Sequence, residues 1–202
     1  MVSLKRIVLV AICGLGLGVL ASAQDPATSK QTLAEKMGFH AVPNGQKAPD
    51  FDAYTTDGKK VLLSDFKGKT VILDFWATWC GPCQVSMPGL EKIYQQIKSK
   101  DVVVLSLNTW DTKPEFQSWV ATNSGSKYHF NFVRDPAEGD KATIRKNSVA
   151  KRLYHVIGIP TMYVIDKDGN VAGSLLGSGS EPGLVKILNG LGVNAVVPAE
   201  SK

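Results

Sequence analysis

The feature that most constrains the fold of this chain is an apolar run that ends directly at a pair of cysteines. Residues 70–77 carry a single charge, that of Asp74. This composition is typical of a central strand that is buried on both faces of a sheet. Cys80 and Cys83 follow at once, and a helical pattern then extends towards Ser99. The sequence therefore predicts that Cys80 lies where a buried strand gives way to a helix.

The predicted position of Cys80 makes its sulfur reactive. The first turn of a helix leaves its N–H groups unpaired and carries partial positive charge, which stabilises a thiolate and lowers its pKa. Pro82 is tolerated there, because its missing N–H would have had no partner in a first turn. Cys83 can attack a mixed disulfide that Cys80 has formed. We interpret this stretch as a redox site in which Cys80 attacks and Cys83 resolves.

Residues 1–23 have the pattern of a secretory signal peptide. Lys5 and Arg6 form a basic start, residues 7–20 an apolar core, and Ala-Ser-Ala at 21–23 a cleavage site. Residues 7–23 are at the lower limit of length for crossing a bilayer, so an uncleaved membrane anchor is the alternative. We expect cleavage, because the core is Gly-rich and the ending is Ala-x-Ala. The expected location is therefore periplasmic or otherwise extracytoplasmic.

Cleavage would leave two of the three cysteines, since Cys13 lies within the removed segment. Disulfides persist outside the cytoplasm, so Cys80 and Cys83 could simply form a structural bridge. A bridge that closes only two intervening residues stabilises little, because the loop-entropy contribution grows with loop length. We therefore favour catalysis over a structural role for the pair.

Length and charge limit the remaining possibilities. The 202 residues suit one globular domain, which we place at residues 45–194, after a polar lead-in at 24–44 and before a frayed tail at 195–202. Without Lys5 and Arg6 the chain carries 21 basic against 18 acidic side chains, scattered along its length. So small an excess gives no support for a nucleic-acid partner.

Helix and strand patterns alternate through the expected domain. They predict strands at 51–54, 61–63, 70–77, 102–107, 128–133, 161–165 and 171–176, and helices after Cys80, from Pro114, after residue 140 and at 181–188. Asp-Gly pairs at residues 57–58 and 168–169 mark hairpin turns, and Ser64 is expected to cap a short turn. Strand, helix and strand around the cysteines make a βαβ unit, with the site at the carboxyl end of a strand.

The run WCGPC at residues 79–83 resembles the active-site motif of the thioredoxin superfamily. Asp74 stands at the place of the buried acid that thioredoxins keep behind their cysteine pair. Pro88 matches the proline that bends their active-site helix. The run GIPT at residues 158–161 resembles their cis-proline loop.

The leader at 1–23 and the long segment at 108–154 make the chain most similar to the TlpA/ResA group of extracytoplasmic thiol–disulfide oxidoreductases, of the AhpC/TSA-redoxin type. The resemblance covers roughly residues 45–192. It implies an α/β, thioredoxin-like fold, with a central mixed β-sheet flanked by helices, an N-terminal β-hairpin and a central αβ insertion. Residues 137–147 exceed the pattern by a few residues, and the sequence offers no function for them.

The resemblance also implies a substrate-binding rim around the cysteine pair. Pro160 should be cis and lie beside the pair, so that Ile159 can offer its backbone groups to an extended substrate segment. Trp79 is expected to form part of an apolar rim, next to Gly81 and Pro82 of the motif. On the family analogy, the proline also keeps metal ions away from the two thiols.

Asp74 is the candidate base for the resolving step, in which Cys83 must lose a proton in a poorly solvated place. Burial disfavours the ionised carboxyl and should raise its pKa towards the working range. The alternative is a hydrogen-bonded acid of the core without a catalytic role. Trp76, two residues further along the same strand, is expected to be a core residue.

No metal site or other cofactor is expected beyond the redox-active disulfide itself. His40, His129 and His155 lie at no metal-ligand spacing. The Asp-Lys-Asp-Gly-Asn run at 166–170 lacks the acidic residue that completes a calcium loop. We interpret that run as a hairpin turn.

The function expected from these features is exchange of disulfides with protein cysteines, more in the direction of reduction. Gly-Pro between the cysteines resembles the reducing thioredoxins. An exported reductant needs a membrane thiol donor, and apocytochromes c are candidate substrates because their C-x-x-C-H haem sites must be reduced. The protein is expected to be a monomer. The alternatives are a peroxiredoxin-like peroxidase and a non-catalytic binding or chaperone module that uses the same thiols.

Overall fold

One mixed β-sheet organises the computed structural model, which describes residue 38 and residues 40–98 and 100–199. The signal peptide expected at 1–23 lies outside the described residues, as does most of the lead-in at 24–44. Seven strands are found in the described part of the chain, in the order β2-β1-β5-β4-β3-β6-β7. They are β1 (Asp52–Tyr54), β2 (Lys60–Leu62), β3 (Thr70–Trp76), β4 (Val102–Asn108), β5 (Asn131–Arg134), β6 (Thr161–Ile165) and β7 (Val171–Leu176).

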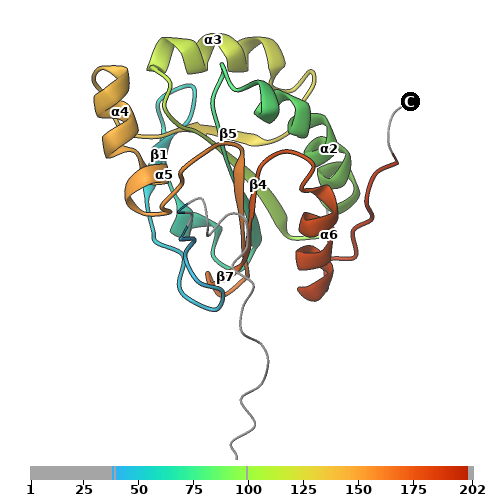
Figure 1. The fold of residues 1–202 in the computed structure, drawn as a ribbon. Coiled ribbons are helices and arrows are strands. Elements are labelled where there is room, and N and C mark those ends of the chain that lie inside the picture. Colours follow the sequence, from blue (N-terminus) through green and yellow to red (C-terminus); the bar gives the residue numbers. More distant parts are fainter. Residues whose placement is uncertain (1–37, 39, 99, 200–202) are drawn as a thin grey trace, which may run out of the picture. The chain divides into compact units, whose positions relative to one another are not determined.

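The helices lie on both faces of this sheet (Figure 1). They are η1 (Leu63–Phe66), α2 (Gly81–Ile97), α3 (Lys113–Asn123), α4 (Lys141–Asn147), α5 (Val149–Arg152) and α6 (Glu181–Gly190). Helices α2 and α6 pack against each other on one side, and α5 lies on the opposite side. Among the described residues, no helix combines the length and the apolar character that a membrane crossing needs.

Strand β3 is the centre of the sheet, and all seven of its residues are buried. It pairs in parallel with β4 and antiparallel with β6, so both edges of its backbone are hydrogen-bonded. Successive side chains of a strand point to opposite faces. Ile72 and Trp76 accordingly pack on one face, and Leu73 and Phe75 on the other. The apolar run in the sequence, interrupted only by Asp74, thus reflects burial on two sides.

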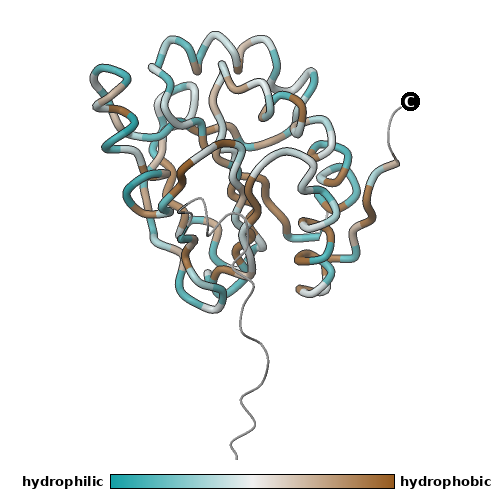
Figure 2. The backbone as a smooth tube through the Cα atoms, in the orientation of Figure 1, coloured by the Kyte–Doolittle hydropathy of each residue, from teal (hydrophilic) through white to brown (hydrophobic). Residues whose placement is uncertain are grey.

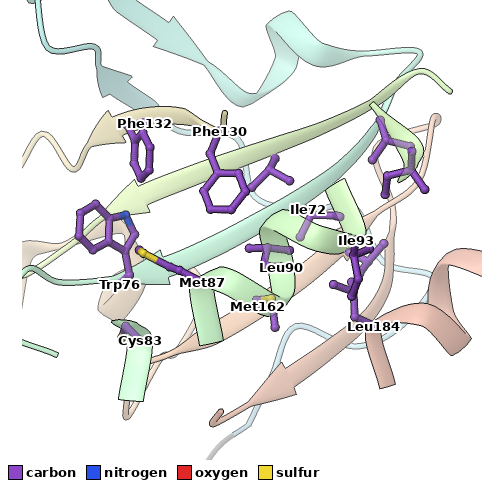
Figure 3. Packing of buried hydrophobic residues seen from close by; sticks show 14 of the residues in the cluster. Ile72, Trp76, Cys83, Met87, Leu90, Ile93, Phe130, Phe132, Met162 and Leu184 are labelled. Atoms are coloured by element: carbon purple, nitrogen blue, oxygen red, sulfur yellow. The ribbon is translucent and has the colours of Figure 1, made fainter. Parts of the chain in front are cut away.

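Two apolar clusters fill the space between the sheet and its helices. In Figure 2 the hydrophobic stretches run through the centre of the view, where the strands lie. The first cluster joins β3 to buried side chains of α2 and α6, and Figure 3 shows Met87 of α2 extending towards the Trp76 ring. The second lies on the opposite face and includes Phe75, Tyr154 and Tyr163. The fold is therefore the mixed, helix-flanked α/β sheet expected from the sequence.

Both predicted hairpins are present. Strands β1 and β2 pair around the Asp57-Gly58 turn, in which Gly58 adopts a φ of +83°. Strands β6 and β7 pair around a turn in which Asp166 accepts hydrogen bonds from the N–H groups of Asp168 and Asn170. The run at 166–170 therefore closes a hairpin.

Two local expectations are wrong. Ser64 does not cap the short helix, because Leu62 is the capping residue and Ser64 lies within the first turn of η1, where its N–H donates to Asp50 at 3.0 Å. Strand β5 begins at Asn131 rather than at residue 128. The aromatic residues before it, Tyr128 and Phe130, pack against each other with ring centroids 5.6 Å apart. Their alternating pattern reflects this aromatic packing instead of strand pairing.

Candidate active site

Cys80 and Cys83 form a disulfide at the start of α2, with their sulfur atoms 2.05 Å apart. Cys80 is the residue that caps the helix, and its Sγ accepts a hydrogen bond from the Cys83 N–H at 3.1 Å. Pro82 occupies the first turn, where a missing N–H costs nothing. The sulfur of Cys80 therefore takes the place of the oxygen of an ordinary N-cap side chain.

Cys80 is more enclosed than its place at a helix end suggests, with only 3% of its surface exposed. The reason is a neighbouring loop, since the Ile159 carbonyl oxygen lies 3.7 Å from the Cys80 Sγ. The bond between Ile159 and Pro160 is cis, as expected. A partner that reaches Cys80 must therefore pass beside the backbone of this loop. Cys83 is more enclosed still, at 1%.

The surface around the disulfide is apolar and open. Trp79 exposes 54% of its surface, and Gly81 and Pro82 are also exposed. Val85, which the sequence analysis did not single out, exposes 73% on the next part of α2. Exposed apolar side chains grouped around a reactive site are typical of surfaces that bind other proteins.

Asp74 lies on the same face of the sheet as the cysteine pair. Its neighbours two residues away on β3, Ile72 and Trp76, both belong to the cluster that contains Cys83. The carboxylate accepts a hydrogen bond from Ser106 Oγ at 3.1 Å. Burial raises the pKa of Asp74 from 3.8 to about 7, and the bond from Ser106 opposes that shift only in part. A carboxyl with this pKa can take up and release a proton near neutral pH.

Asp111 is a second buried acid near the site, and its role was not predicted from the sequence. Its Oδ2 accepts hydrogen bonds from the Thr78 N–H and from the Asn108 side chain, both at 2.7 Å. Burial raises the pKa of Asp111, and the bond from Thr78 opposes the shift. Thr78 lies two residues before Cys80, so Asp111 fixes the turn that leads to the disulfide. The sequence signal that could have located Asp111 is its place among the polar residues directly after β4, the strand that pairs in parallel with β3.

Among the residues that the structure describes, no three His, Cys, Asp or Glu side chains are grouped closely enough to hold an ion. His129 instead pairs with Glu91 of α2, with 2.7 Å between its Nδ1 and the carboxylate. His155 is exposed. The chemistry that this arrangement allows is thiol–disulfide exchange at Cys80 and Cys83.

Comparison with known proteins agrees with the geometry of the site. The model of the AhpC/TSA family matches residues 44–174. A thiol–disulfide oxidoreductase ResA of Bacillus thuringiensis is 34% identical over 157 residues, which are 78% of this chain and 80% of that protein. The thioredoxin-like protein YneN of Bacillus subtilis is 38% identical over 63% of this chain and 68% of its own length.

A solved structure shows the same fold. A crystal structure from Chlorobium tepidum, assigned as a thiol:disulfide interchange protein DsbE, is 31% identical and has a TM-score of 0.61. The match covers 75% of this chain and 99% of that one. The chain therefore belongs to the AhpC/TSA family of the thioredoxin superfamily, among the ResA-like thiol–disulfide oxidoreductases.

Proposed function

We propose that this protein is an exported thiol–disulfide oxidoreductase that reduces disulfides in other proteins. The observation that carries the proposal is the Cys80 sulfur, which caps α2, accepts the Cys83 N–H at 3.1 Å and is bonded to Cys83. Export is supported by the sequence pattern of residues 1–23. The reducing direction is supported by the Gly-Pro pair between the cysteines.

In the proposed cycle, the Cys80 thiolate attacks one sulfur of a substrate disulfide. The substrate S–S bond breaks, a mixed disulfide forms, and the departing substrate sulfur takes up a proton. Asp74 accepts the proton of Cys83, whose thiolate attacks the Cys80 sulfur and releases the second substrate thiol. Two electrons pass to the substrate and the Cys80–Cys83 disulfide remains. The first departing substrate sulfur takes its proton from solvent, and the second can take the proton that Asp74 accepted from Cys83.

Substrate is proposed to bind as an extended segment beside the cis-proline loop. The Ile159 backbone, already 3.7 Å from the Cys80 sulfur through its carbonyl oxygen, can pair with such a segment as an added strand would. Pro160 shapes this loop. The exposed Trp79, Gly81 and Pro82 supply the apolar rim against which the rest of the partner packs.

Reduction of each substrate disulfide leaves the Cys80–Cys83 pair oxidised. A membrane thiol donor must reduce the disulfide again after each turnover, and no cofactor beyond that disulfide is required. Apocytochromes c are the proposed substrates, because their C-x-x-C-H sites accept haem only when reduced. The protein is proposed to act as a monomer in the periplasm or an equivalent compartment.

Trapping in the exporting cell tests the proposal. Cys83→Ser removes the resolving sulfur, so mixed disulfides between Cys80 and its substrates should accumulate and can be identified by mass spectrometry. Cys80→Ser is the matched control and should capture none of these partners. Equal capture by both variants, or by neither, would contradict the assigned roles. A Cys80-dependent consumption of peroxide without captured proteins would favour a peroxidase instead.

A further inference from the structure

A pocket of about 230 Å³ opens beside the redox site. It is lined by Trp79, Trp110, Lys141 and Arg145. Trp79 directly precedes Cys80, so one wall of the pocket belongs to the rim of the active site. The two cations come from α4, which lies in the segment at 137–147 that the sequence left without a function. This segment therefore reaches the immediate surroundings of the reactive sulfur.

The floor of the pocket is fixed in place. Trp110 is only 5% exposed, and its indole N–H donates a hydrogen bond to Ser148 Oγ at 3.1 Å. Its φ of +66° lies in the left-handed region, which bulky residues rarely adopt. Burial of the ring and its bond to Ser148 hold this backbone conformation, and so present one face of the indole to α4.

Arg145 supplies the unmatched positive charge of the pocket. Its guanidinium lies 4.5 Å from the centroid of the Trp110 ring, and it forms no ion pair with any described residue. Lys141 differs, because its Nζ lies 2.9 Å from the Glu115 carboxylate, which offsets its charge. The negative charge of the Asp111 carboxyl also favours the charged form of Lys141 and adds to the rise in its pKa that Glu115 causes. The cation of the pocket that lacks a carboxylate partner among the described residues is therefore Arg145.

We propose that this pocket binds a carboxylate side chain of the protein substrate, an Asp or Glu close in sequence to the disulfide-bonded cysteine. A planar guanidinium binds a carboxylate through two parallel N–H···O bonds, and stacking on Trp110 sets the orientation of that fork. The exposed Trp79 ring would cover the apolar stem of the acidic side chain. This inference rests on the proposed function and adds to it a substrate preference.

Pairs of disulfide-bonded peptides that differ only by Glu or Gln test the preference. The acidic residue is placed in turn at successive positions on either side of the cysteine, and kcat/KM for reduction is measured with the full chain in its reduced form. At one position we expect the Glu peptide to be preferred roughly two- to five-fold, as for an exposed ion pair. The preference should shrink at about 1 M salt, where the screening length is about 3 Å.

Three variants test whether the pocket itself, and not a general attraction between charges, causes the preference. Arg145→Gln should abolish the preference for Glu, whereas Lys146→Gln should retain it. Lys146 lies on the same helix and its replacement changes the net charge equally, but it does not line the pocket. Arg145→Lys keeps the charge without the planar fork and should retain only part of the preference. Thermal unfolding of each variant shows whether it has folded.

Equal rates for the Glu and Gln peptides at every position would overturn the inference and leave the proposed function intact. Equal losses of preference in Arg145→Gln and Lys146→Gln would overturn it as well, because the charge would then act from a distance. If the reduced protein transferred electrons to no peptide and to no small disulfide, the proposed function itself would fail.

Discussion

The backbone N–H of Cys83 lies 3.1 Å from the sulfur of Cys80 and donates a hydrogen bond to it. This bond makes the sulfur part of the helix, because it satisfies one of the N–H groups that the first turn would leave unpaired. When the disulfide is reduced, the same donor and the positive helix end favour a negative Cys80 sulfur. The reactivity of the site therefore depends on where α2 begins.

The raised pKa of Asp74 predicts a stability that depends on pH. Between pH values of about 4 and about 7 the folded protein retains a proton that the unfolded chain releases, so the free energy of unfolding falls as the pH rises through this window. The Asp74→Asn substitution removes this pH-dependent fall in the free energy of unfolding. At 1.36 kcal/mol per pKa unit, the oxidised variant should be more stable at about pH 8 by at most about 4 kcal/mol. Urea unfolding at about pH 8 and about pH 4 measures the difference.

The gain should shrink to well under about 1 kcal/mol at the lower pH, because the folded protein then holds the proton and the unfolded chain, near its own pKa, also holds it in a large fraction of its molecules. Asp168→Asn replaces an exposed carboxyl and should leave stability unchanged at both pH values. An equal gain for Asp74→Asn at both pH values would show that the titration of Asp74 has no part in it.

Asp74→Asn should also slow the resolving step. If the carboxyl accepts the proton of Cys83, its loss should reduce the rate of release from a preformed mixed disulfide by up to about 100-fold near neutral pH. The difference should narrow at alkaline pH, where hydroxide deprotonates Cys83 directly. Stopped-flow measurement across the pH range checks this. If the unsubstituted protein and Asp74→Asn had the same release rate at every pH, Asp74 would be a core residue without a catalytic role.

Trp76 and Trp79 form a matched pair of aromatic residues with opposite exposure. Trp76→Ala should cost about 3–5 kcal/mol of stability, because a fully buried ring is removed from the main cluster. Trp79→Ala should change stability by less than about 0.5 kcal/mol, since its ring is largely exposed. It should instead lower kcat/KM for protein disulfides while leaving exchange with dithiothreitol unchanged. Equal loss with both substrates would mean that Trp79 acts on the sulfur chemistry and not on partner binding.

Asp111→Ala should loosen the turn before the cysteines. The substitution leaves the Thr78 N–H and the Asn108 amide without their acceptor, at a cost of about 1–3 kcal/mol. Amide hydrogen exchange at Thr78 should accelerate more than exchange in β3, because the opening is local. Unchanged protection of Thr78 would show that other contacts hold the turn.

The sequence was sufficient for the parts of the fold that depend on local pattern. The apolar run of β3 predicted a strand covered on both faces, and the Asp-Gly pairs located both hairpins. The pattern failed at residues 128–130, where alternating aromatic residues pack among themselves instead of joining a strand. Side-chain alternation cannot distinguish these two forms of burial.

The site was predictable where its residues are contiguous and was missed where the fold assembles it. Cys80 and Cys83 are recognisable from spacing and from their place at a helix start. Asp111 reaches Thr78 across 33 residues of sequence, and Arg145 reaches Trp110 across 35. The place of Asp111 just after a strand indicates its region, but no local pattern specifies the partner in either contact, because the partners depend on the order of the strands and on where α4 packs.

The pKa of the Cys80 thiol tests the central claim most directly. In the reduced protein carrying Cys13→Ser and Cys83→Ser, the rate of alkylation by iodoacetamide as a function of pH reports Cys80 alone. The donor at residue 83 is a backbone group and survives the substitution. The account predicts a midpoint at about pH 7.5 or lower, at least about one unit below an ordinary thiol. A midpoint at about 8.5 or higher would show that the helix start does not activate this sulfur.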